Sequence, residues 1–184
     1  MAMQRTSAIL AAFILLASCS SAPDPGSASP QDRQSITEAV RGGMTARQTA
    51  FTPVPPICPG PVSATVRNEL ATKAPILLGA YFTSPELEQE IEIATRVISE
   101  RGGPACIYGG GVEWVRLDRV STKGSSAVAT GQFRGWSKIA QWQESGSKMA
   151  EPHNTIDVTV NLSRINGQWL ISRYKWKFAR GSEP

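Results

Sequence analysis

The residues that could do covalent or metal chemistry in this chain are few: three cysteines and a single histidine. A catalytic thiol needs a histidine or a basic side chain nearby, and neither Cys58 nor Cys106 has one close in the sequence. A metal site would need more ligands than His153 and these two cysteines supply. No Ser-His-Asp set and no phosphate-binding loop is recognisable. We therefore predict no catalytic residue, no metal and no cofactor.

The third cysteine, Cys19, directly follows the most apolar stretch of the chain. Met1 to Arg5 carries one basic side chain, and about ten apolar residues follow from Ala8 to Ala17. A membrane-spanning helix needs about twenty apolar residues, so this block is too short to cross a bilayer. Its length is typical of a secretory signal peptide, which predicts export.

Leu16-Ala17-Ser18-Cys19 resembles the lipobox of bacterial lipoproteins, with an aliphatic residue, two small residues and the cysteine. The resemblance implies that Cys19 is thioether-linked to a diacylglycerol and that residues 1–18 are a cleaved signal peptide. Two or more acyl chains would anchor the protein stably to the bacterial cell membrane, in a leaflet that depends on the host. A plain signal peptide with a chance cysteine, or an uncleaved anchor, is the alternative.

Residues 19–31 are small, polar and proline-rich, so they are predicted to be a flexible tether ahead of a single domain over residues 32–184. Export would place Cys58 and Cys106 in an oxidising compartment. Both lie among prolines and glycines, where a bridge would stabilise the fold by about 3–4 kcal/mol in the chain-entropy model. We predict a structural disulfide, and two reduced buried thiols are the alternative.

Two helices are expected before residue 83. The first covers residues 31–51, with Gly42-Gly43 as a potential break. The second is capped by Ser63 and broken or restarted at Pro75. The apolar segment 76–82 is expected to be buried.

A third helix has the clearest start in the chain, at Ser84-Pro85-Glu86. Its apolar stripe comprises Leu87, Ile91, Ala94 and Ile98. The glutamates at positions 86, 88, 90 and 92 spread around the helix and are expected to form a solvated face.

Alternating apolar and polar residues after the third helix predict four antiparallel strands, which form a sheet with one apolar and one solvated face. A polar loop over residues 143–154 contains His153, for which no partner is evident, and Asn166-Gly167 is a strong hairpin signal. The strands are expected at residues 112–120, 126–141, 156–162 and 170–178.

The apolar segment 77–83 ahead of a helix and the hairpin Ile165-Asn166-Gly167-Gln168-Trp169-Leu170-Ile171 together resemble the nuclear transport factor 2-like cone. This family includes ketosteroid isomerases, SnoaL-like cyclases and many envelope proteins, and the resemblance would cover residues 31–178. It implies an α+β domain in which N-terminal helices pack on one face of a curved four-stranded antiparallel sheet. The insertion at residues 52–61 departs from the family pattern.

Enzymes of this family place an Asp, His or Tyr against the apolar sheet face, and here Tyr174 is the only titratable residue expected on that face of the last two strands. Asp157 is expected on the other face, paired with Arg173 or Lys175. Glu113 and Asp118 could face inward from the first strand. We expect no enzymatic activity, with a ketosteroid isomerase-like or SnoaL-like enzyme as the alternative. The apolar set of these two strands is Ile156, Val158, Val160, Leu162, Leu170, Tyr174 and Trp176.

A non-enzymatic role as a membrane-anchored binding or accessory module is therefore favoured. The cone could carry an apolar ligand, or its aromatic side chains could simply form the core. The possible pocket lining is Trp114, Tyr174, Trp176 and Phe178. Residues 112–184 carry eleven Lys/Arg against six Asp/Glu, and a basic sheet face could dock an acidic envelope protein or anionic headgroups. The residues of that face are Arg164, Arg173, Lys175 and Lys177.

Nucleic acid is a poor partner for an exported domain. A phage-type exclusion lipoprotein would have the same sequence features, and the oligomeric state is left open.

Replacing the lipobox cysteine tests the anchor. Cys19→Ser removes the thiol to which the lipid would be attached, so the protein is expected to move from the membrane fraction into the soluble envelope fraction. Cell fractionation followed by immunoblotting measures this, with Cys58→Ser as a matched control that stays at the membrane. Full retention of the Cys19→Ser chain at the membrane would contradict the lipobox interpretation.

Overall fold

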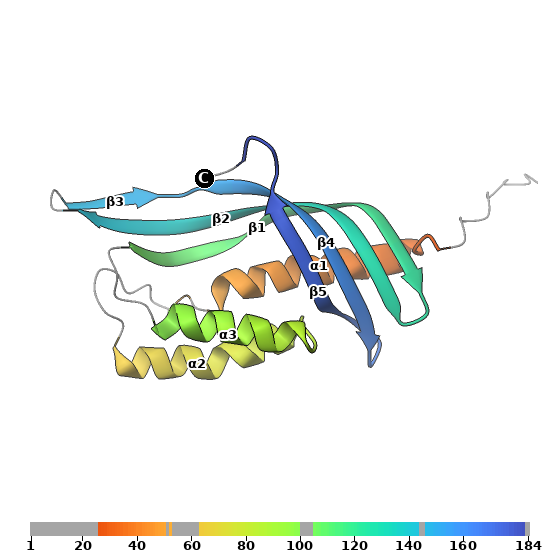
Figure 1. Ribbon diagram of the computed structural model, residues 1–184, viewed down its shortest axis with the longest axis horizontal. Coiled ribbons are helices and arrows are strands. Elements are labelled where there is room, and N and C mark those ends of the chain that lie inside the picture. The colour runs from red at the N-terminus through yellow and green to blue at the C-terminus, as the bar shows by residue number, and fades with distance from the viewer. Residues whose placement is uncertain (1–25, 51, 53–62, 100–104, 144–145, 183–184) are drawn as a thin grey trace, which may run out of the picture.

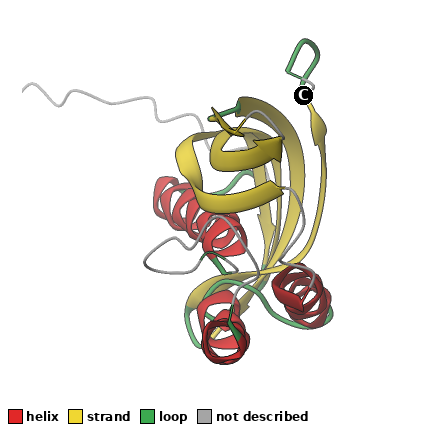
Figure 2. Cartoon of the chain, turned by 90° about the vertical axis from the view of Figure 1, so that its left-hand side faces the viewer, coloured by secondary structure: helices red, strands yellow, loops and turns green. Residues whose placement is uncertain are grey.

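The computed structural model describes residues 26–50, 52, 63–99, 105–143 and 146–182, and within them three helices precede five strands (Figure 1). The sheet bends around the helices, which lie on its concave side (Figure 2). The predicted α+β arrangement, with helices on one face of a curved antiparallel sheet, is confirmed. The elements are α1 (Pro30–Thr49), α2 (Ala64–Gly79), α3 (Glu86–Ser99), β1 (Ala105–Lys123), β2 (Ser126–Gln143), β3 (Gly146–Ala150), β4 (His153–Ile165) and β5 (Gln168–Phe178).

The sheet has the strand order β1-β2-β4-β5, with β3 paired to the end of β2. β3 and β4 both lie along β2 and are separated by Glu151 and Pro152. The expectation of a polar loop over residues 143–154 was therefore wrong, because β2 continues to Gln143 and its last residues pair with β3. The described sheet has five strands where the sequence predicted four.

β1 is longer than predicted because its glycine-rich beginning pairs with β2. Ala105 is opposite Gln141, and Gly111 is opposite Trp136. Cys106 thus lies in a strand rather than in a loop. Cys58 lies outside the described residues, as does the predicted disulfide.

Neither predicted helix break occurs. α1 runs through Gly42, and a Cβ atom at this position would lie 2.1 Å from the Cε1 atom of Tyr81, so glycine allows a close packing contact rather than a break. α2 continues through Pro75. The expectation that segment 76–82 is buried was only partly correct, because the side chain of Ile76 is 74% exposed whereas Leu78 and Phe82 are buried in the core.

A β-bulge at Ser172 determines which side chains of β5 face the helices. Leu162 is opposite Ile171 and Asn161 is opposite Arg173, so Ser172 has no partner on β4. Trp169 and Ile171 are buried on the inner face before the bulge. Leu170 is opposite Ser163 on the outer face, which corrects its predicted place in the apolar set. After the bulge, the inner positions are Tyr174, Trp176 and Phe178, opposite Val160, Val158 and Ile156.

The contact between β1 and β2 at Gly131 gives a test of the sheet. A Cβ atom at Gly131 would lie 2.1 Å from the backbone oxygen of Arg116, which cannot move without disturbing β1. Gly131→Ala is therefore expected to lower the free energy of unfolding by about 1–3 kcal/mol, measured by urea titration. Gly109→Ala is the matched control in the same sheet, because the nearest atom would be 3.5 Å away. Equal effects of the two substitutions would contradict this packing.

Candidate functional site

An ionic network around a buried carboxylate joins α1, α3 and β5. The side chain of Glu90 on α3 is only 2% exposed. Its Oε2 atom lies 3.0 Å from Nε of Arg47 on α1, and its Oε1 atom accepts a 2.6 Å hydrogen bond from the hydroxyl of Tyr174 on β5. The prediction of a solvated glutamate face was wrong at this position, because Glu90 is on the side of α3 that faces the sheet. These three residues are called the Arg47–Glu90–Tyr174 network below.

A second glutamate lies one turn earlier on the same side of α3. Glu86 is 5% exposed, which again contradicts the predicted solvated face. Burial raises the pKa of its carboxyl group, and the hydrogen bond from the backbone of Tyr174 partly opposes this shift. Burial likewise raises the pKa of the Tyr174 hydroxyl, which therefore stays a neutral donor toward Glu90.

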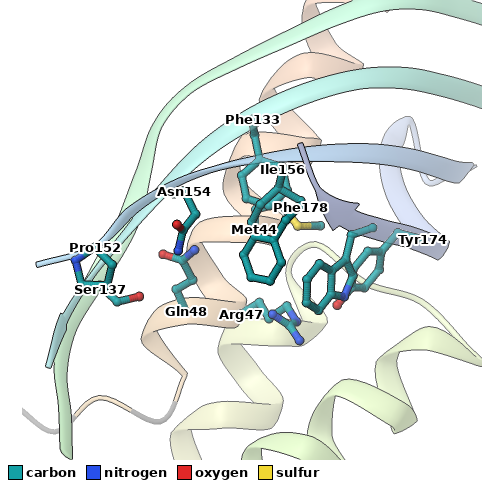
Figure 3. Close-up of a pocket in the computed structure, with 12 residues that line it drawn as sticks. Met44, Arg47, Gln48, Phe133, Ser137, Pro152, Asn154, Ile156, Tyr174 and Phe178 are labelled. Atoms are coloured by element: carbon teal, nitrogen blue, oxygen red, sulfur yellow. The ribbon is translucent and has the colours of Figure 1, made fainter. Parts of the chain in front are cut away.

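A cavity of about 180 Å³ lies between α1 and the sheet, next to this network. The amides of Gln48 and Asn154 point toward one another at one end, Phe133 lies over the middle, and Arg47 lies nearer Tyr174 at the other end (Figure 3). The volume slightly exceeds the roughly 150 Å³ of an engineered cavity that binds benzene. Its lining residues are Met44, Arg47, Gln48, Phe133, Gly135, Ser137, Pro152, Asn154, Ile156, Tyr174, Trp176 and Phe178.

Several polar groups of this lining have no hydrogen-bond partner within the described ranges. Arg47 uses Nε to bind Glu90, and its two terminal amino groups have no hydrogen-bond partner among the described residues. The Oε1 atom of Gln48 is buried, and it too has no hydrogen-bond partner among the described residues. Gly135 leaves space for the Gln48 amide, since a Cβ atom there would lie 2.7 Å from Nε2. The cavity therefore combines an apolar wall with groups able to bind a polar head.

The structure brings together three of the four aromatic residues predicted to line a pocket. Tyr174, Trp176 and Phe178 line the cavity, and Trp176 remains 46% exposed. Trp114 is not among the lining residues. It is paired with Arg134, the neighbour of the inward-facing Phe133, and cross-strand partners share a face, so Trp114 lies on the outer face.

The predicted basic face is divided between the two sides of the sheet. Arg173, Lys175 and Lys177 are exposed on the outer face of β5, opposite Asn161, Thr159 and Asp157. Asp157 lies 3.8 Å from Lys177 rather than pairing with Arg173 or Lys175 as predicted, because Lys177 is directly opposite it.

Arg164 is separated from these three residues. It occupies an inner-face position, forms an ion pair with Asp32 near the start of α1, and stacks 4.4 Å from the ring centre of Trp169. The predicted four-residue set therefore does not form one surface.

The two acidic residues expected to face inward from β1 do not reach the cavity. Glu113 hydrogen-bonds to Nδ1 of His153 and lies 3.1 Å from Nε of Arg134. His153 thus has a partner that the sequence did not reveal, and it begins β4 rather than lying in a loop. Asp118 is on the surface and lies 3.4 Å from Arg116.

Within the described ranges, no three or more His, Cys, Asp or Glu side chains are grouped as metal ligands would be. None of the described helices is both long enough and apolar enough to span a bilayer. Cys19 lies outside the described residues.

Sequence reasoning did not identify Arg47, Gln48 or Glu90. Arg47 lies three residues after Met44 in α1, within one turn of the buried residues of this helix. Glu90 lies one residue before Ile91 and four before Ala94. Adjacency to a buried stripe was the only signal, and it does not distinguish a buried charge from one at the edge of the stripe.

Comparison with known proteins identifies the fold and no family. No protein-family model matches the chain, and no curated protein matches it either. The intermembrane space region of the chloroplast protein ARC6 is similar with a TM-score of 0.53 and 9% identity, over 83% of this chain and 98% of that chain. At this identity the likeness shows a shared α+β fold alone.

Two further solved structures are similar with TM-scores below 0.5 and say nothing more about the chain. One is an IcmL-like type IV secretion system protein from Legionella pneumophila, with a TM-score of 0.42, 9% identity, and coverage of 86% and 98% of the two chains. The other is a putative calcium/calmodulin dependent protein kinase II association domain from Xanthomonas campestris, with a TM-score of 0.39, 13% identity, and coverage of 85% and 95%.

The two buried glutamates are expected to respond in opposite ways to the same substitution. Glu90→Gln removes the charge that pairs with Arg47, so the free energy of unfolding should fall by about 1–3 kcal/mol. Glu86→Gln keeps an acceptor for the Tyr174 backbone and removes a carboxyl group whose pKa is raised by burial.

The direction of the pH effect of Glu86 follows from the linkage between proton binding and folding. The folded state holds the Glu86 proton more tightly than the unfolded state, so folding stability falls as pH rises above the ordinary value of 4.5. Glu86→Gln should remove this decline, so that its stability relative to the natural chain improves as pH rises from 4.5 toward neutrality. Urea titrations across this range measure it. A stability difference that does not change with pH would contradict the assignment to Glu86.

Proposed function

We propose that the chain is a lipid-anchored protein of the bacterial cell envelope with a nuclear transport factor 2-like cone, and that it acts as a non-enzymatic binding module. The lipobox-like Leu16 to Cys19 supports the anchor, and the order of helices and strands supports the cone. The ligand site is the cavity between α1 and the sheet.

The main support for a binding role is that the ionisable side chains of the site bind one another. Tyr174 donates its hydroxyl to Glu90, and Glu90 also accepts from Arg47. Glu90 is not among the residues that line the cavity. A general base must reach the proton that it removes, whereas Glu90 lines a separate cavity, together with Arg47 and Leu78. The network therefore favours binding over proton transfer.

The polar groups of the lining that have no partner in the described part of the chain indicate the kind of ligand. The terminal amino groups of Arg47 are donors, so they would bind a hydrogen-bond acceptor such as a carbonyl or carboxylate. Phe133, Ile156 and Phe178 would contact an apolar body. We infer a small amphipathic molecule, of about the size of one aromatic ring or a short alkyl chain.

Native mass spectrometry of the full-length protein, purified from the envelope in a non-ionic detergent of known mass, tests this role. The natural chain is expected to carry a reproducible additional small-molecule mass that is lost on unfolding. Ser137→Phe should abolish it by filling the cavity, because Ser137 is part of the lining. Thr159→Phe is the matched control, because Thr159 is exposed on the outer face. An apo mass for the natural chain would contradict a carrier role.

A second candidate function is docking of an acidic envelope protein. The supporting observation is the row formed by Arg173, Lys175 and Lys177, which alternate along the exposed face of the edge strand β5. The Lys177 side chain is 80% exposed and lies 3.8 Å from Asp157. An apo cavity together with a charge-dependent crosslink from this row would favour the accessory role.

A further inference from the structure

The N-terminal segment is attached to the sheet before α1 begins. The backbone oxygen of Gly26 accepts a 3.1 Å hydrogen bond from Thr122, and the N–H of Ala28 donates a 3.2 Å hydrogen bond to Val120. Ser27 forms a β-bridge with Ser121. The predicted tether of residues 19–31 is therefore shorter than expected, since its last part is paired with β1.

Only six residues, Ser20 to Pro25, separate Cys19 from this attachment. Seven residue steps of at most about 3.6 Å give a maximum reach of about 25 Å. α1 alone, with 20 residues, spans about 30 Å. If Cys19 carries the lipid anchor, the end of the domain where α1 begins must therefore stay close to the membrane.

That end of the domain is built from three neighbouring segments. The N–H of Arg164 donates to the backbone oxygen of Ser125 at 2.7 Å, which joins the β4–β5 hairpin to the β1–β2 turn. The side chain of Arg164 pairs with Asp32 near the start of α1. Both hairpins and the start of α1 lie at the same end of the molecule (Figure 1). We call this end the hairpin end, and its exposed residues include Arg33, Lys123, Arg164 and Ile165.

The hairpin end is basic and partly apolar. Asp32 is neutralised by Arg164, whereas Lys123 is exposed and has no ion-pair partner within the described part of the chain. Arg33 donates to the backbone oxygen of Leu117 at 3.0 Å and forms no ion pair among the described residues. The side chain of Ile165, at the hairpin tip, is 41% exposed. Basic side chains beside an exposed aliphatic residue suit an anionic lipid surface.

We infer that the hairpin end rests on the anionic phospholipid surface of the membrane in which the chain is anchored, with Lys123 among the headgroups and Ile165 at the interface. This inference rests on the proposed lipid anchor. The partner is a bilayer rather than a free anion, because the short tether keeps this end close to a bilayer.

A fluorescent depth probe on the full-length lipidated protein tests the contact. Ile165→Cys is labelled with an environment-sensitive fluorophore, and the protein is reconstituted into phosphatidylcholine vesicles containing one third phosphatidylglycerol. Ala150→Cys is the matched control, because Ala150 is exposed on β3, which pairs with the far end of β2 from the β1–β2 turn. The unsubstituted chain gives the background from its own thiols. We expect a blue-shifted emission, quenched by lipids that carry a quencher near the headgroup, at position 165 only.

Charge is tested in the same vesicles. Lys123→Glu in the Ile165→Cys background should reduce the ratio of bound to unbound hairpin end at least about fivefold, as expected for the loss of one basic residue near an anionic surface. Lys148→Glu on β3 should have no effect. Raising the salt concentration should weaken the contact. The contact should also be weaker on vesicles of phosphatidylcholine alone than on the vesicles that contain phosphatidylglycerol.

The outcomes separate this inference from the proposed anchor. A chain that stays on the vesicles with position 165 in water would overturn the membrane contact and leave the anchor intact. A blue-shifted and quenched emission at position 150 instead of position 165 would show that the opposite end of the domain faces the membrane, which also overturns the inference. A lipidation-competent chain that is not retained on vesicles would remove both proposals. An equal response on neutral vesicles would show that headgroup charge is not recognised, which also overturns it.

Discussion

The Glu90 carboxylate is the constraint on which the arrangement of the elements depends. A buried charge is costly unless it is paired and hydrogen-bonded, and Glu90 obtains its two partners from α1 and from β5. α3 cannot slide along the sheet without separating Glu90 from Arg47 or from Tyr174. Apolar contacts such as those of Ala94 and Ile98 are less specific about position, because they can be exchanged for one another. The network therefore selects one position for α3, and the same two partners form a wall of the cavity.

The bulge at Ser172 makes this network possible. Side chains alternate along a regular strand, so if Ser172 continued this alternation instead of forming a bulge, Tyr174 would be on the outer face whenever Ile171 is on the inner face. The bulge lets Ile171 pack in the core and Tyr174 reach Glu90 from the same face. It also places Trp176 and Phe178 along the cavity, and Arg173, Lys175 and Lys177 on the outside. One unpaired residue thus gives β5 both its ligand-facing side and its basic side.

The sequence predicted those parts of the fold that depend on local patterns. The alternation over residues 156–162, the Asn166-Gly167 turn and the start of α3 are local, and each is present in the structure. The bulge could not be read in this way, because its position depends on pairing with β4. The burial of Glu86 and Glu90 was missed for a similar reason, since the partners of Glu90 lie 43 and 84 residues away. Arg164 was grouped with Lys175 because both are basic and belong to the last two strands, whereas its partner Asp32 is on another element.

α1 connects the two functional proposals, because one of its ends is close to the tether and the other carries the cavity. The chain is paired with β1 at Ala28, whereas Arg47 and Gln48 lie near the end of α1. At 1.5 Å per residue, α1 separates these points by about 25 Å. If the hairpin end rests on the membrane and α1 points away from the bilayer, the cavity lies well above the headgroups of the same bilayer. A ligand that is embedded in this bilayer cannot then enter the cavity directly. The geometry favours a ligand that arrives through the aqueous phase or is transferred by a protein that reaches the same height.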